Sequence, residues 1–139
     1  MKPVLLDTGV IVALLDPTDR LHQRCADAIA AVEGPLLTCE PVITESCHLL
    51  RRVEGAAGAI LESVQTGEFE IPEGLSAAAA PVRRILERFR DQDIDLADAF
   101  LIHMADEFDT GQILTVDRNF FVYRWGKNNP FEVLVRLEF

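Results

Sequence analysis

Short apolar runs alternate with longer amphipathic stretches along almost the whole chain, and this order limits the folds open to it. The apolar runs predict β-strands at residues 2–6, 36–38, 68–71, 112–116 and 131–137. The amphipathic stretches predict helices at 8–15, 20–33, 41–53, 56–65, 73–89 and 96–108, with a helical turn at 117–122 and a loop at 123–130. Strands that alternate with helices need crossover connections. The order therefore predicts an α/β protein whose parallel sheet is covered on both faces.

Length and cysteine usage narrow the class of protein further. The 139 residues suit one domain with a sizeable core, which we expect to span residues 1–139. No apolar run approaches the ~18–20 residues that span a membrane, and the first run is interrupted by Asp7 and lacks a signal-peptide cleavage site. Cys25, Cys39 and Cys47 show no metal-ligand spacing. An odd number of such cysteines favours reduced thiols in a cytoplasmic protein.

The formal net charge of −10 argues against broad, nonspecific binding of nucleic acid through bulk charge. It is compatible with a cationic partner or with bound metal ions. Positive charge is concentrated on the helix predicted at 73–89, at Arg83, Arg84 and Arg88. With Glu87 among them, these arginines form either a solvated helix face or a contact for phosphates.

Asp98 lies on the apolar side of the helix predicted at 96–108. At 100° per residue it projects with Leu101 and Ile102, whereas His103 falls on the opposite, polar face, which we expect to meet solvent. A carboxylate on the packed side of a helix is costly unless something compensates it. The position of Asp98 therefore predicts a pocket that holds a partner for this charge.

Three further acids occupy comparable positions. Asp7 ends the first predicted strand, Asp117 follows the strand at 112–116, and Glu45 lies one turn into the helix at 41–53. Ligands of open parallel sheets bind outside the carboxyl ends of the strands. Asp98 lies in the first turn of the helix at 96–108. This turn reaches the same edge of the sheet only if the chain crosses over the sheet before the helix begins.

Each acid also has a purely structural interpretation. Asp7 can cap the next helix, Asp98 can belong to a capping box begun by Asp95, Glu45 can be a surface residue, and Asp117 can stabilise a turn. Taken together, however, several acids in one pocket would repel one another and cannot all stay ionised without cations. A hard divalent ion such as Mg²⁺ or Mn²⁺ takes carboxylate oxygens and would resolve this conflict.

Two other enzyme or signalling classes place an Asp after the first strand. A haloacid-dehalogenase-type phosphotransferase needs a second Asp two residues later, where this chain has Gly9. A receiver-like phospho-acceptor domain needs a Lys near its last strands, and the lysines here are Lys2 and Lys127, the latter in the predicted loop. Both classes are disfavoured, and the glycine-rich phosphate-binding motifs are absent from the sequence.

At these residues the chain resembles a PIN-domain ribonuclease, in particular a VapC-type toxin of a type II toxin–antitoxin pair. The resemblance runs through nearly the whole chain in order. Its motifs are D-T-G at 7–9, T-E-x-x-x-L-L at 44–50, L-A-D-A at 96–99 and T-x-D-x-x-F at 115–120.

The resemblance implies a three-layer α/β/α sandwich around a parallel sheet of about five strands. It implies an Mg²⁺- or Mn²⁺-dependent endoribonuclease in which a metal-activated water attacks a backbone phosphorus. The family's catalytic and metal-binding positions correspond to Asp7, Glu45, Asp98 and Asp117. Thr8 and Thr115 match the supporting hydroxyls, and we consider Arg83, Arg84 and Arg88 as RNA contacts.

The resemblance also implies partners: an RNA substrate, a VapB-type antitoxin whose basic tail enters the acidic groove, and a second copy of the chain in a homodimer. One departure concerns Asn119, where many relatives carry a further Asp. It leaves open whether the site binds one metal ion or two. The alternative function is a PIN-like domain that binds RNA or a protein without turnover.

Overall fold

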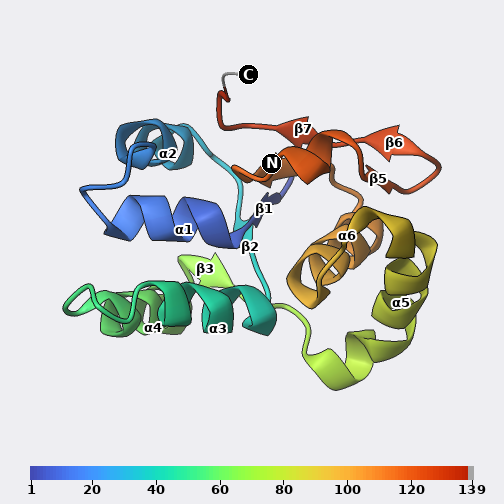
Figure 1. Ribbon diagram of the computed structural model, residues 1–139, viewed down its shortest axis with the longest axis horizontal. Helices are drawn as coiled ribbons and strands as arrows, with labels where there is room; N and C mark the ends of the chain where they lie inside the picture. The colour runs from blue at the N-terminus through green and yellow to red at the C-terminus, as the bar shows by residue number, and fades with distance from the viewer. Residues whose placement is uncertain (138–139) are drawn as a thin grey trace.

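A parallel five-stranded sheet with the order β3–β2–β1–β4–β7 forms the centre of the computed structural model, which describes residues 1–137 (Figure 1). Each neighbouring pair of strands in this sheet is parallel. The strands are β1 (Val4–Leu6), β2 (Leu36–Leu37), β3 (Phe69–Glu70), β4 (Gln112–Leu114) and β7 (Glu132–Val133). The predicted parallel sheet is confirmed, but its strands are shorter than the apolar runs. Some residues beside the strands, such as Thr115, are buried but do not pair with a neighbouring strand. An apolar pattern indicates burial and does not show where strand pairing ends.

Six helices cover the two faces of this sheet. They are α1 (Thr8–Leu15), α2 (His22–Ala30), α3 (Glu40–Leu49), α4 (Ala56–Thr66), α5 (Leu75–Arg88) and α6 (Leu96–Phe108). Parallel strands are joined by right-handed crossovers. Because the chain moves from β1 outward to β3 and then returns to β4, α1–α4 lie on one side of the strands and α5–α6 on the other (Figure 1). The three-layer α/β/α sandwich is confirmed.

Side-chain caps explain where several helices begin. The backbone N–H of Thr8 donates to Asp7 Oδ1 at 2.8 Å, and that of Asp98 donates to Asp95 Oδ1 at 2.8 Å. These caps fix the starts of α1 and α6, whose bounds match the prediction. The prediction started the next helix at residue 20, but α2 begins at His22. There the N–H of Leu21 donates to Asp19 Oδ1 at 2.8 Å and holds the chain in a turn.

The expectation that His103 is solvated is wrong. Its side chain is buried, and its Nε2 lies 2.5 Å from Oε1 of Glu73, in the loop before α5. Helix α5 packs against α6, so α6 lies between a helix and the sheet (Figure 1). A helical pattern of polar residues cannot show that another segment covers part of the polar face.

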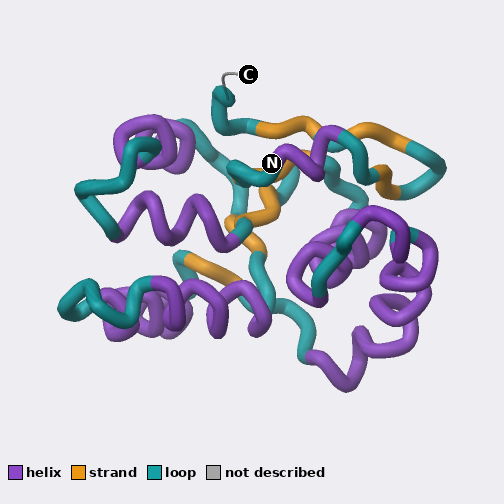
Figure 2. The backbone as a smooth tube through the Cα atoms, viewed as in Figure 1, coloured by secondary structure: helices purple, strands orange, loops and turns teal. Residues whose placement is uncertain are grey.

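The expected loop at residues 123–130 is instead a small antiparallel hairpin (Figure 2). Its strands are β5 (Arg124–Trp125) and β6 (Asn129–Pro130), and the turn between them has positive φ angles at Gly126 (57°) and Asn128 (69°). Trp125 Nε1 donates to the Pro130 carbonyl at 3.1 Å. Pro130 and the polar turn residues had masked this short strand pair, because proline and turn formers are depleted in strands.

The helical turn predicted at 117–122 is a 3₁₀ helix at Arg118–Phe121, and a second one lies at Arg90–Gln92. The three cysteines are free thiols. Within residues 1–137, no helix has both the length and the apolar character needed to cross a membrane.

Candidate active site

The site lies at the carboxyl edge of the sheet, between β1 and β4. After β1 the chain turns into α1 on one face, whereas β4 is reached from α6 on the other face. Such a switch point opens a crevice at the carboxyl ends of the strands. Asp7 directly follows β1, and Asp117 lies just beyond β4. Helix α6 runs back along the sheet, so its first turn brings Asp98 to the same edge, as the prediction required.

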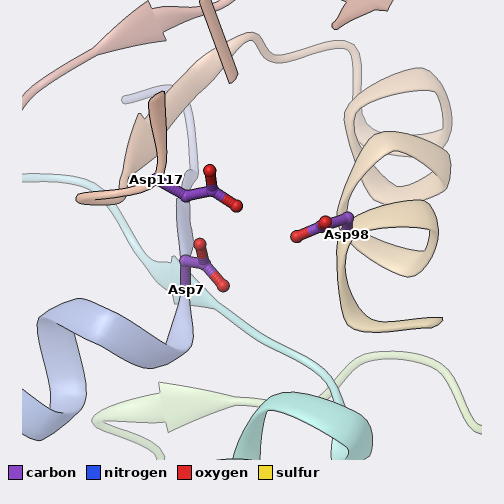
Figure 3. A group of neighbouring side chains, drawn as sticks. All are labelled: Asp7, Asp98 and Asp117. Carbon is purple, nitrogen blue, oxygen red and sulfur yellow. The ribbon is translucent and has the colours of Figure 1, made fainter. Parts of the chain in front are cut away.

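Three of the four predicted acids meet there. Asp7 and Asp117 lie side by side, and the carboxylate of Asp98 faces them from α6 (Figure 3). One carboxylate oxygen from each residue lies within 4.8 Å of the others. Three hard oxygen donors at this separation suit Mg²⁺ or Mn²⁺, which bind few protein carboxylates and retain water ligands.

Hydroxyl groups hold two of these carboxylates in place. Thr115 Oγ1 donates to Asp7 Oδ2 at 2.7 Å, and the same hydroxyl oxygen accepts the N–H of Asp117 at 3.0 Å. Thr115 thus connects both acids and is itself fully buried. The other carboxylate oxygen of Asp7 accepts the N–H of Thr8. Asp7 is therefore both a helix cap and a member of the acidic group.

Glu45 stands at the rim of the site and outside the three-acid group. It is exposed on α3, and its Oε1 accepts the Thr8 hydroxyl at 2.6 Å. It lines the same pocket of about 230 Å³ as Asp7, Asp98 and Asp117. Thr8 therefore connects the rim acid to the cap of α1.

Asp95 also lines this pocket, although the sequence indicated only a capping role for it. Because it lies three residues before Asp98, the cap that starts α6 brings a fifth carboxylate to the pocket. The D-x-x-D spacing at the start of an apolar helix was the signal for this second role.

Burial and like charges make ionisation of this site costly. Burial, followed by the charges of Asp95, Asp7 and Asp117, raises the pKa of Asp98 from 3.8 to about 8. Burial also raises the pKa of Asp7 to about 6, against the opposing effect of its hydrogen bonds from Thr115 and Thr8. Without a cation, the pocket therefore favours the protonated form of the Asp98 carboxyl. These shifts fit a pocket whose acids ionise together with a bound cation.

Tyr123 is a neighbour of the site that the sequence analysis missed. Its hydroxyl donates to Asp98 Oδ2 at 3.2 Å, and its side chain is fully buried. The ring packs edge-on against Phe89 and Phe120, with centroids 5.4 Å and 5.1 Å away. Burial and the neighbouring Asp98 raise the pKa of the phenol, so it stays a hydrogen-bond donor. As the chain's one tyrosine, six residues beyond Asp117, it was visible in the sequence, but its contact with α6 was not.

Gly9, the third residue of D-T-G, is required by packing. A Cβ at this position would lie 2.4 Å from Cγ2 of Val116. A side chain at position 9 would therefore force Val116, the residue before Asp117, to move.

The structure does not bring the α5 arginines to the acidic pocket. Arg83, Arg84 and Arg88 are exposed, and none of them lines it. Arg88 instead lies against the Phe89 ring and a surface pocket near Arg124. A contact between these arginines and RNA remains a prediction.

Comparison with known proteins agrees with this architecture. A model of the PIN domain family matches residues 4–125. The chain is similar to Ribonuclease VapC26 of Mycobacterium tuberculosis, with 28% identity over 120 residues that cover 85% of this chain and 89% of the relative. Its fold is similar to the crystal structure of M. tuberculosis VapC20, described as a sarcin–ricin loop cleaving toxin, with a TM-score of 0.79 and 19% identity over 91% of this chain and 99% of that one.

At that identity the structural likeness supports the fold alone. The family match carries more weight, because it spans most of the chain and includes the four predicted acids, from Asp7 to Asp117. On this ground, the chain belongs to the PIN domain family.

Proposed function

We propose that this protein is an endoribonuclease of the VapC type that hydrolyses RNA with Mg²⁺ or Mn²⁺. The observation that carries the proposal is the meeting of three carboxylates within 4.8 Å at the switch point of a PIN-domain sheet. The similarity to a protein named as a ribonuclease supports the same activity. Relatives that are named as VapC proteins support the role of a toxin.

In this proposal Asp7, Asp98 and Asp117 hold the cation, and Glu45 completes the acidic site from its rim. The four acids are also the catalytic residues. When bound, the ion supplies a water of lowered pKa and neutralises charge on the phosphate. Asp117, the least buried of the three converging acids, is either a ligand or the group that orients the attacking water.

The surrounding residues position these acids. Thr115 holds Asp7 and the backbone of Asp117 together, and Thr8 fixes Glu45. The Tyr123 hydroxyl restricts Asp98 through its hydrogen bond to Oδ2. Because these donors are already in place, few side chains need to reorganise when the carboxylates lose their protons.

The proposed partners follow from charge and family. The acidic pocket of a chain with net charge −10 would attract the basic tail of a VapB-type antitoxin. We also propose a homodimer and a cytoplasmic location, where the three free thiols would remain reduced. Residues 1–139 would act as a single PIN domain.

The test is cleavage of labelled RNA by the purified protein with Mg²⁺, with Mn²⁺ and with a chelator. We expect cleavage with either metal and none with the chelator. Asp7→Asn and Asp98→Asn should remain folded and lose cleavage, whereas the matched variant Asp91→Asn, at an exposed acid on another segment, should retain it. Full activity in either site variant would overturn the assignment. RNA that is bound but left intact by the wild-type protein would instead favour a binding domain without turnover.

A further inference from the structure

Three arginines from two distant segments line one small polar pocket. Arg20 precedes α2, Arg24 lies within it, and Arg118 starts the 3₁₀ helix after β4. Together with Leu21, Val116 and Leu137 they enclose about 250 Å³, a space that we call the arginine pocket. Cationic side chains from different segments that line one small space can together bind an anion, because each guanidinium has several N–H donors.

The arginine pocket directly adjoins the acidic pocket. Val116 lines both of them. The next residue, Asp117, faces the acidic pocket, and the one after it, Arg118, lines the arginine pocket. A single short segment therefore separates the proposed cation site from a cluster of guanidinium groups.

The local structure holds two of these arginines near each other. The turn before α2 is fixed by the hydrogen bond from the Leu21 N–H to Asp19 Oδ1, and it presents Arg20 beside the first turn of the helix. Arg24 Nη1 donates to the Arg136 carbonyl at 3.1 Å, which anchors this guanidinium at the edge of the pocket. A guanidinium has five N–H donors in a planar fork and can bond a carbonyl and a phosphate together.

Charge makes this position significant. The chain has 23 acids and 13 bases, so a polyanion is repelled by most of the molecule and most strongly by the acidic pocket. A bound cation would offset the repulsion of one phosphate only. Neighbouring phosphates of the same strand need positive charge beside the acidic pocket, and three of the chain's bases lie there.

We propose that the arginine pocket binds a backbone phosphate of single-stranded RNA next to the phosphate that is cleaved. This inference rests on the proposed nuclease function and adds the site that holds the substrate strand in register. It assigns the principal RNA contact to Arg20, Arg24 and Arg118. The exposed arginines of α5, which do not line either pocket, would contribute little.

Binding of a labelled single-stranded RNA oligonucleotide tests this assignment. It is measured over a series of KCl concentrations in the inactive Asp98→Asn background, so that cleavage does not interfere. We expect Arg20→Gln/Arg24→Gln to weaken binding about ten-fold at low salt. The slope of log K against log [KCl] should become shallower by ~0.7 for each phosphate that the variant no longer neutralises. The matched variant Arg83→Gln/Arg84→Gln, which removes the same charge from α5, should change both quantities much less. An equal or larger effect of the α5 variant would overturn the proposal.

Cleavage by the active protein separates this inference from the nuclease proposal. On RNA, kcat/KM of Arg20→Gln/Arg24→Gln should fall about ten-fold. On bis(p-nitrophenyl) phosphate, which has one phosphate and no neighbour, it should stay unchanged. Equal decreases on both substrates, or no decrease on RNA, would overturn the inference while leaving the nuclease function intact. If the wild-type protein cleaves neither substrate, the nuclease proposal fails, and the binding series still decides the role of the pocket.

The bond from Arg24 to the Arg136 carbonyl gives this side chain a structural role as well. Thermal unfolding of each variant therefore accompanies the measurements. If the double variant does not fold, the single variant Arg20→Gln, at an exposed position in the turn, replaces it. We then expect about three-fold weaker RNA binding, and unchanged binding would contradict the proposal.

Discussion

Helix α6 buries two ionisable side chains, and their surroundings differ sharply. His103 lies against Glu73, in the loop before α5, and its Nε2 is within hydrogen-bond distance of the Glu73 carboxylate. The charges that raise the pKa of Asp98, in the first turn, come from other acids of the described chain: Asp95, Asp7 and Asp117. Both residues are 6% exposed, so burial alone does not distinguish them. A buried polar group with a hydrogen-bond partner is satisfied within the fold, whereas a buried carboxylate among like charges requires a cation from outside.

The largest expected effect comes from substitution of Asp98, the buried residue that lies among other acids. Asp98→Asn removes a proposed metal ligand but keeps the N-cap from Asp95. We expect RNA cleavage to fall by roughly 10²–10³-fold, as when a group that stabilises transition-state charge is removed. The thermal midpoint of the metal-free protein should stay equal or rise, because the neutral amide can be buried among the acids without taking up a proton. A large drop in that midpoint would mean that Asp98 serves the fold and would break the comparison.

The pH dependence of stability tests the same carboxyl groups in the wild-type protein. In the unfolded state both carboxyls lose their protons near pH 3.8. In the native state Asp7 keeps its proton up to a pH of about 6, and Asp98 keeps its proton up to a pH of about 8. The free energy of unfolding of the metal-free protein should therefore fall as the pH rises through this window.

Mn²⁺ should restore that stability at high pH, by about 2.7 kcal/mol at a hundred-fold excess over Kd. The stabilisation should be smaller near pH 5, where protons compete for the carboxylates. Thermal melts with Mn²⁺ and with a chelator at both pH values measure the difference. Stabilisation that is independent of pH would contradict a site built from these acids.

Substitution of Glu73, the partner of His103, should lower the stability of the protein and leave its RNA cleavage unchanged. We expect Glu73→Ala to lower the free energy of unfolding by roughly 1–3 kcal/mol, because His103 would then be buried without its partner. Urea unfolding measures this decrease. RNA cleavage per folded molecule should stay near the wild-type value. A selective loss of cleavage in a fully folded variant would show that the pair serves the active site.

The smallest effect is expected at Tyr123, which belongs to both the core and the site. Tyr123→Phe keeps the ring packing against Phe89 and Phe120 and removes only the hydrogen bond to Asp98 Oδ2. We expect the free energy of unfolding to fall by ~1 kcal/mol or less. Metal affinity, measured by Mn²⁺ titration, should weaken up to about ten-fold. An unchanged Mn²⁺ affinity would reduce Tyr123 to a core residue.

Much of the fold could be predicted from sequence signals that span only a few residues. The bounds of α1 and α6 match the prediction because an aspartate before each helix satisfies the first free backbone N–H groups. The alternation of strands and helices predicted the parallel sheet, since crossovers leave few other arrangements. The ordered acids Asp7, Asp98 and Asp117 predicted a common site, and the fold brings these three together.

Other features depended on which elements pack together. His103 was expected in solvent, because one helix cannot reveal that another segment will cover part of its polar face. The hairpin of β5 and β6 was hidden by Pro130 and by polar turn residues. Tyr123 and the arginine pocket join segments far apart in the chain. No periodicity of 2 or 3.6 residues encodes such contacts.

The sequence by itself determined the six α-helices and the sheet strands, their order and the acids that the family motifs mark, because caps, periodicity and motifs act within a few residues of the chain. Only the tertiary structure decided which buried polar groups have a partner. It gave His103 a hydrogen-bond partner in Glu73 and left Asp98 among other acids. The physical reason is that burial and charge–charge interactions depend on distance in space, and segments 25 to 108 residues apart supply the hydrogen bonds that define this site.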